Sequence, residues 1–126
     1  MDIIYYKNYS DIYKCDKIIC LSHFSRQDLT MLIYILEGVA KGKKCNLSNE
    51  HFIKRKDVGL ELIQSDVDYG ISQINKNKFV CRLSRITYLN AIDLIKNLLN
   101  NKMHGFQWLY DIDTSVEFLL SKDGRW

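Results

Sequence analysis

The chain has 126 residues, of which 47% are hydrophobic and 26% are charged, and its formal net charge is +3. This length corresponds to one domain, and a chain of this size buries enough surface to fold without a disulfide or a metal. The composition excludes a disordered or collagen-like chain, and the small excess of positive charge excludes a histone-like binder of nucleic acid. We therefore expect one globular domain over residues 1–126.

The first third of the sequence predicts a strand followed by a helix. A β-rich run at 16–21 predicts the strand, and the sequence also allows an earlier strand at 3–6. Ser25 and Asp28 are typical of a helix start, because a serine hydroxyl and a carboxylate satisfy free N–H groups of the first turn. Apolar residues then recur at helical spacing from Leu29 to Ala40, and Gly42 is suited to end the helix.

The middle of the sequence predicts a loop, three strands and a second helix. Residues 43–56 have no periodic pattern and are expected to form the loop. The runs 58–64, 69–74 and 79–83 are joined by short links, which favour an antiparallel meander. The second helix is expected at 86–101, with Ser84 or Arg85 at its start.

The last part of the chain, 105–126, predicts a β-hairpin. Period-two alternation places two sets of apolar side chains on one buried face: Phe106, Trp108, Tyr110 and Ile112, then Val116, Phe118 and Leu120. The complete order is β-α-β-β-β-α-β-β. We therefore expect an α+β fold, with five or six strands in a mainly antiparallel sheet and two amphipathic helices packed on one side of it.

The four cysteines are expected to be free thiols. The N-terminal segment shows no secretory signal pattern, and the longest apolar run, 31–36, is far shorter than a bilayer span, so we expect a cytoplasmic protein without membrane contact. Cys15, Cys20 and His23 have a ligand-like spacing, but no second ligand pair accompanies them. We therefore predict no metal site, and a site formed by these three residues is the alternative.

No enzyme motif is present in the sequence. The glycine-rich nucleotide loops, the metalloprotease helix motif and the serine nucleophile elbow are all missing, and His23, His51 and His104 are isolated from one another. Cys81 alternates with apolar neighbours and is expected to face the core. The prediction is a protein that is not an enzyme and uses no cofactor.

Basic residues form two groups on either side of the expected loop. Lys43 and Lys44 precede it, and Lys54, Arg55 and Lys56 end it. Such residues bind phosphates, so a small nucleic-acid-binding protein is an alternative function. The sequence lacks the motifs of the common nucleic-acid-binding domains, so nucleic acid is not the expected partner.

Charge is distributed in alternating blocks along the chain. Windows 57–74 and 103–121 contain four and three carboxylates respectively and no Lys or Arg, whereas 41–56 and 75–102 each contain six basic residues and one acidic residue. If the two acidic windows are neighbours in the fold, they form an acidic surface that attracts a basic partner.

The C-terminal part of the chain resembles a known protein family. The segments 104–111 (HGFQWLYD) and 116–126 (VEFLLSKDGRW) resemble the end of small bacterial immunity proteins of contact-dependent growth inhibition and related polymorphic toxin systems. In that family a Gln-aromatic-Leu-Asp strand is followed by a strand that closes with Ser-x-Asp or Ser-x-Asn. The strand 59–63 and the helix 89–98 are compatible with this resemblance.

The resemblance implies inhibition by stoichiometric binding. Its partner would be the toxin domain at the C-terminus of a large secreted effector, and a nuclease is the expected toxin. From the charge windows we infer the toxin-binding residues: Asp66, Asp68, Tyr69, Asp111, Asp113 and Glu117. Trp108 is a second candidate anchor if it lies outside the core. An adaptor domain without inhibitory function is the other alternative, and the oligomeric state stays open.

Overall fold

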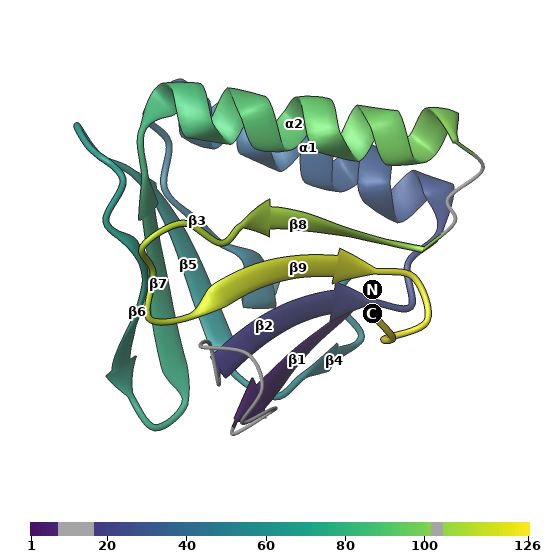
Figure 1. Ribbon diagram of the computed structural model, residues 1–126, viewed down its shortest axis with the longest axis horizontal. Coiled ribbons are helices and arrows are strands. Elements are labelled where there is room, and N and C mark those ends of the chain that lie inside the picture. The colour runs from purple at the N-terminus through teal and green to yellow at the C-terminus, as the bar shows by residue number, and fades with distance from the viewer. Residues whose placement is uncertain (8–16, 102–104) are drawn as a thin grey trace.

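The computed structural model describes residues 1–7, 17–101 and 105–126, which fold into two sheets below a pair of helices (Figure 1). The first sheet has the strand order β4-β1-β2-β9-β8 and the second has the order β3-β5-β7-β6. The predicted α+β class is confirmed, but the expected single sheet is replaced by two.

The first sheet joins the two ends of the described chain. Its strands are β1 (Asp2–Lys7), β2 (Lys17–Ser22), β4 (Arg55–Lys56), β8 (Phe106–Tyr110) and β9 (Glu117–Ser121). The pairs β1–β2 and β8–β9 are antiparallel, whereas β2–β9 and β1–β4 are parallel. The strands expected at 3–6 and 16–21 and the C-terminal hairpin are therefore present in the fold, with Asp16 outside the described residues.

The second sheet is built from the middle of the chain. Its strands are β3 (Cys45–Asn46), β5 (Gly59–Gln64), β6 (Gly70–Asn75) and β7 (Lys78–Leu83). A short 3-10 helix, η1 (Leu47–Asn49), follows β3. The prediction of an unstructured loop at 43–56 is therefore wrong in part, because β3 and β4 within it extend the edges of the two sheets.

The predicted antiparallel meander is also wrong. β5 pairs in parallel with β7, and β6 lies outside β7 at the edge of the sheet. The reason is hydrophobicity: Phe79, Val80 and Cys81 are consecutive buried residues, as a central strand requires, whereas the last three residues of β6 are exposed. A strand of that polarity is more stable at an edge.

The two helices begin and end at local sequence signals. α1 (Arg26–Ala40) starts with the predicted capping box, in which the Ser25 hydroxyl accepts the Asp28 N–H and the Asp28 carboxylate accepts the Ser25 N–H. Gly42 follows the helix at a φ of +97°, as expected of a terminating glycine. α2 (Arg85–Asn100) starts at Ser84, whose hydroxyl accepts the Thr87 N–H. Both helices lie on the same side of the two sheets (Figure 1).

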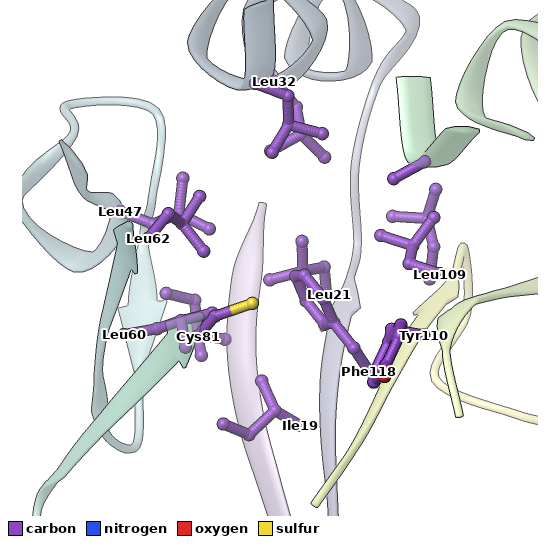
Figure 2. Close-up of a cluster of buried hydrophobic side chains, with 14 of the residues drawn as sticks. Ile19, Leu21, Leu32, Leu47, Leu60, Leu62, Cys81, Leu109, Tyr110 and Phe118 are labelled. Carbon is purple, nitrogen blue, oxygen red and sulfur yellow. The ribbon is translucent and has the colours of Figure 1, made fainter. Parts of the chain in front are cut away.

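The core lies between the helices and the two sheets. Figure 2 shows Leu32 of α1 above Leu62 and Cys81 of the second sheet and above Leu21 and Phe118 of the first. All five side chains are at most 3% exposed. One continuous core therefore holds both sheets, and Cys81 lies in it as expected.

The predicted alternation in β8 is wrong because this strand contains a bulge. Trp108 is opposite Leu119 and Tyr110 is opposite Phe118, so Leu109 is an additional residue in the pairing. Leu109 and Tyr110 both enter the core, while Phe106 and Ile112 are exposed. Trp108 packs instead against a small apolar cluster on the outer face of the sheet, which contains Ile18, Cys20 and Leu119. The alternation predicted for Val116, Phe118 and Leu120 is confirmed.

Candidate protein-interaction surface

Two loops that are distant in sequence meet at one end of the molecule. The loop 65–69 joins β5 to β6, and the loop 111–116 joins β8 to β9. The Ile71 N–H donates to Thr114 Oγ1 at 3.0 Å, and Ser115 Oγ donates to the Ile71 carbonyl at 3.1 Å. Ile71 also forms an isolated antiparallel bridge with Val116. These contacts link the second sheet to the first and bring the two predicted acidic windows together.

Carboxylates from both loops surround one tyrosine at this end. Burial raises the pKa of the Tyr110 phenol, and the negative charges of Asp68 and Asp113 raise it further, with a smaller effect from Asp111. Asp68 belongs to one loop, while Asp111 and Asp113 belong to the other. The charges of both loops therefore act on the same phenol, in agreement with the contacts between Ile71 and the loop 111–116.

Asp68 has a structural function in addition to its charge. Its carboxylate accepts the Ser84 N–H and the Thr87 hydroxyl, both at 2.7 Å, and so caps the first turn of α2. Burial on its own would raise the pKa of Asp68, but the hydrogen bonds from Ser84 and Thr87 outweigh this effect and hold the pKa below its usual value. Asp68 is thus ionised at neutral pH and ties the loop 65–69 to the helix.

Exposed apolar side chains accompany these charges. Val67 and Tyr69 in one loop are 53% and 63% exposed, Ile112 in the other is 66% exposed, and Ile86 in the first turn of α2 is 68% exposed. Exposed apolar residues beside charged ones are typical of protein-binding surfaces. We call the loops 65–69 and 111–116 with the first turn of α2 the acidic end.

The carboxylates of the acidic end are available to a partner. Within the ranges 1–7, 17–101 and 105–126, no ion pair joins Asp66, Asp111 or Asp113 to a basic side chain. Two basic residues belong to the adjoining elements: Arg82 lies opposite Gly70 in β7, and Arg85 is the first residue of α2. The surface therefore offers four exposed aspartates, of which only Asp68 accepts hydrogen bonds from other residues that the structure describes.

Other predicted acidic residues lie elsewhere. Glu117 is half-buried in β9 with Ile18 opposite it, and alternation from the buried Phe118 places it on the outer face of the first sheet. Asp57 pairs with Arg55 at 3.4 Å, and Glu61 pairs with Lys78 at 3.9 Å. Trp108, the other candidate anchor, also belongs to the outer face of the first sheet.

The basic residues of the alternative nucleic-acid site are divided between two sheets. Lys43 and Lys44 immediately precede β3, whereas Lys54, Arg55 and Lys56 lie at or in β4. The Lys56 ammonium is already bound, since it donates to the Ser48 carbonyl at 2.9 Å. The five residues therefore do not line one strand or one sheet edge.

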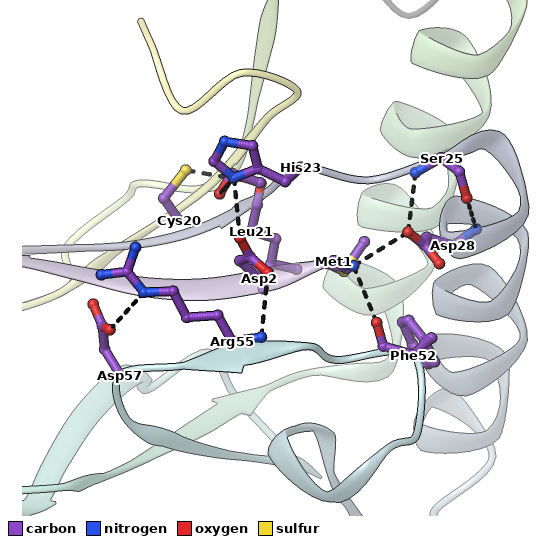
Figure 3. Close-up of polar contacts among 11 residues, drawn as sticks. Met1, Asp2, Cys20, Leu21, His23, Ser25, Asp28, Phe52, Arg55 and Asp57 are labelled. Atoms are coloured by element: carbon purple, nitrogen blue, oxygen red, sulfur yellow. Dashed lines mark hydrogen bonds and ion pairs between the residues drawn. The ribbon is translucent and has the colours of Figure 1, made fainter.

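A polar cluster at the start of the chain connects β1, β2 and β4. His23 Nδ1 lies 3.1 Å from the Asp2 carboxylate and 3.0 Å from Ser22 Oγ (Figure 3). A serine nucleophile system needs serine and aspartate on opposite nitrogens of the ring, whereas here both lie at Nδ1. Asp2 also accepts the Arg55 N–H at 3.2 Å. The geometry is that of a structural link between strands.

The thiols in the described part of the chain are poor nucleophiles. Burial raises the pKa of Cys20 and of Cys81 to about 12, and burial together with the Glu50 charge raises that of Cys45 to about 11. Of the three alternative metal ligands, Cys15 lies outside the described residues, whereas Cys20 and His23 lie within them. No group of three potential ligands occurs among the residues that are described.

Of the four exposed apolar side chains at the acidic end, only Tyr69 is predicted as a contact residue from the sequence. Ile112 was expected in the core, and Val67 and Ile86 were not considered as contact residues. A signal was available for Val67, because it lies between Asp66 and Asp68 in a predicted link between strands. Ile86 could have been identified because it precedes Tyr88, the first of the buried residues of α2, and does not share their helical spacing.

Comparison with known proteins adds no relative of this chain. No protein-family model, no curated protein and no solved structure matches it. Neither helix in the described ranges has the length and hydrophobicity that crossing a membrane would require.

Proposed function

We propose that this protein is a cytoplasmic immunity protein that neutralises a toxin domain by binding it tightly through the acidic end. The observation that carries the proposal is the meeting of two acidic loops, which unites separate charge windows into one exposed surface with apolar side chains. The resemblance of segments 104–111 and 116–126 to immunity proteins supports the same function. According to this proposal, the protein is a stoichiometric inhibitor and not an enzyme.

The chemistry of the acidic end favours a nuclease as the toxin. A nuclease binds the phosphates of its substrate in a basic cleft, and clustered aspartates fit such a cleft electrostatically. Tyr69 and Ile112 supply the apolar contact that holds a complex together once the charges have met. Charge therefore accelerates association, while the aromatic and aliphatic side chains slow dissociation.

The proposal expects a large secreted effector encoded beside this gene, and the C-terminal domain of that effector is the toxin used in the test. That domain is expressed in a sensitive host with and without the present protein. Survival only in its presence, together with a purified one-to-one complex, supports the proposal. Unchanged killing and no complex between the purified proteins would overturn it.

The surface is tested with matched charge variants. Asp66→Lys with Asp111→Lys reverses two exposed charges of the acidic end that have no hydrogen-bonding function in the described structure. Glu37→Lys with Asp93→Lys makes the same change in net charge on the exposed faces of the helices. We expect the first pair to slow association at least about tenfold at low salt and the second to leave it nearly unchanged. Equal effects would mean that the toxin binds elsewhere.

A further inference from the structure

A surface pocket lies beside the C-terminal end of α1, on residues that the proposed function does not use. Its volume is about 240 Å³, and it is lined by Tyr34, Ile35, Glu37, Gly38, Val39, Lys41, Lys43, Lys44, Cys45 and Glu50. Tyr34 is 72% exposed, so its ring is free to contact a bound molecule. Three lysines and an aromatic ring thus share one concave surface.

The lysines are held at this pocket by the way in which α1 ends. Beyond Lys41, the Gly42 N–H donates to the Val39 carbonyl and the Lys43 N–H donates to the Gly38 carbonyl, both at 3.0 Å. This pair of bonds is a Schellman motif, and it requires the positive φ of Gly42. Because Gly38 has no side chain, the aliphatic part of Lys43 lies next to the helix, 3.5 Å from where a Cβ at Gly38 would stand.

The end of α1 does not repel an anion as an open helix C-terminus would. All four of its last carbonyls, from Glu37 to Ala40, already accept hydrogen bonds from protein donors. The last of them, Ala40, accepts the side-chain amide of Gln64 at 2.6 Å. The partial negative charge that these groups would present is therefore largely satisfied within the fold.

The pocket retains a positive charge after its acidic residues are counted. Glu50 accepts a hydrogen bond from the Cys45 thiol at 3.6 Å, and Glu37 is the other carboxylate in the lining. In the part of the chain that the structure describes, Lys41, Lys43 and Lys44 form no ion pair with any carboxylate. Three ammonium groups thus face two carboxylates, and the ammonium groups are unpaired.

We propose that this pocket binds a nucleoside phosphate, with the base against the Tyr34 ring and the phosphate between the lysines. An aromatic platform beside cationic side chains is the arrangement with which proteins hold nucleotides of single strands. A free nucleotide and the 5′ end of a strand share this chemistry. The pocket shares no lining residue with the acidic end, and this proposal does not depend on the toxin-binding proposal.

The site is tested by titrating the isotope-labelled protein in NMR with adenosine monophosphate, adenosine and inorganic phosphate. We expect adenosine monophosphate to shift the amide resonances of Gly38, Lys43 and Lys44. Adenosine alone and inorganic phosphate alone should each bind at least tenfold more weakly. Tyr34→Ala and the pair Lys43→Glu with Lys44→Glu should each weaken adenosine monophosphate at least tenfold. Lys76→Glu with Lys96→Glu makes the same change in net charge at exposed positions outside the pocket, and this pair and Tyr69→Ala should each leave the binding of adenosine monophosphate unchanged.

Two results would overturn the proposal. The first is the lack of any shift with millimolar adenosine monophosphate. The second is equal binding of phosphate and adenosine monophosphate that Tyr34→Ala leaves unchanged, which would indicate an adventitious ion only. If adenosine monophosphate binds, a 5′-phosphorylated oligoadenylate shows which natural ligand the pocket prefers. Tighter binding of the oligoadenylate indicates the 5′ end of a strand, and equal or weaker binding indicates a free nucleotide.

Discussion

Gly70 lies so close to Thr114 that it has no room for a side chain. A Cβ at Gly70 would lie 2.8 Å from the Thr114 Cβ, and the φ of Gly70 is +82°. Thr114 Oγ1 also accepts the Ile71 N–H and donates to the Val116 carbonyl at 2.8 Å. This contact sets the separation of the two loops that form the acidic end.

Replacing Gly70 should therefore destabilise the protein and separate the loops. Gly70→Ala combines the strain of a left-handed backbone, about 1 kcal/mol, with a steric conflict of about 1–3 kcal/mol. Gly105→Ala is the control, since Gly105 has a φ of +77° but no atom within 4 Å of its Cβ position. Urea unfolding should show the larger loss for Gly70→Ala. Equal losses would mean that the Thr114 contact is unimportant.

The Tyr88 hydroxyl should contribute to stability because it joins α2 to two strands. It donates to the Ile63 carbonyl at 2.8 Å and lies 3.0 Å from the Cys81 carbonyl, and the side chain is buried. Tyr88→Phe leaves these buried acceptors without that donor, at a cost of about 1–3 kcal/mol in the free energy of unfolding. Tyr34→Phe removes an exposed hydroxyl and should change stability by less than about 0.5 kcal/mol.

The bulge in β8 and the end of this strand at Tyr110 predict opposite outcomes for two aliphatic residues. Leu109 is 5% exposed and packs in the core, while Ile112 is 66% exposed. Leu109→Ala should cost about 2–5 kcal/mol in unfolding experiments, and Ile112→Ala should cost less than about 0.5 kcal/mol. A strict alternation along β8 would give the reverse result, so the pair of variants tests the register directly.

Two capping aspartates should make the protein less stable in acid. For Asp28, burial acts to raise the pKa, but the Ser25 N–H and the Met1 ammonium lower it by more, and Asp68 is likewise lowered by Ser84 and Thr87. A carboxylate whose pKa is lower in the folded state stabilises the fold above its unfolded pKa of about 4. That stabilisation is lost as the pH falls through the folded pKa.

The measurement compares unfolding of the protein and of Asp28→Asn between about pH 6 and pH 2. The difference in stability should be largest near neutral pH and should shrink as the solution becomes more acidic. Thr30→Ala removes a neutral hydroxyl that donates to the Arg26 carbonyl, so its effect should not vary with pH. A constant difference for Asp28→Asn would rule out the ion pair and cap as its cause.

Local signals made the helices predictable. Ser25, Asp28 and Gly42 act on groups within one helical turn, so the sequence around them is sufficient to place both ends of α1. The same holds for Ser84 at α2. The buried residues of α2 also recur at helical spacing, because a helix that covers a sheet buries one face along its whole length; they are Tyr88, Ala91, Ile92, Ile95 and Leu98.

Strand pairing depended on interactions that are distant in sequence. The short links between β5, β6 and β7 favoured a meander, yet burial of Phe79, Val80 and Cys81 on both faces placed β7 in the centre. That run of three apolar residues was a visible signal for a central strand. The bulge at Leu109 left no such signal, because it arises from the partner strand β9 and from the small cluster on the outer face of the first sheet.

The candidate surface was predictable in its aspartates and in Tyr69, but not in its aliphatic residues. Asp66, Asp68, Asp111 and Asp113 lie at strand ends that the topology brings together, so counting charges by window was enough to find them. Glu117 lies in the same acidic window of the sequence, but in β9 its side chain is on the outer face of the first sheet. Ile112 lies in the loop 111–116, beyond the end of β8 at Tyr110, so extending the alternation of the strand to it placed it wrongly in the core.

The bridge between Ile71 and Val116 makes the acidic end a product of the whole fold. One of its loops belongs to each sheet, and the contact between them exists only when both sheets have docked below the helices. A fragment that contains only one of the two sheets would carry two of the four aspartates and would lack the other two. Only the fully assembled chain can present this surface, so a partner that recognises it also selects against incomplete copies.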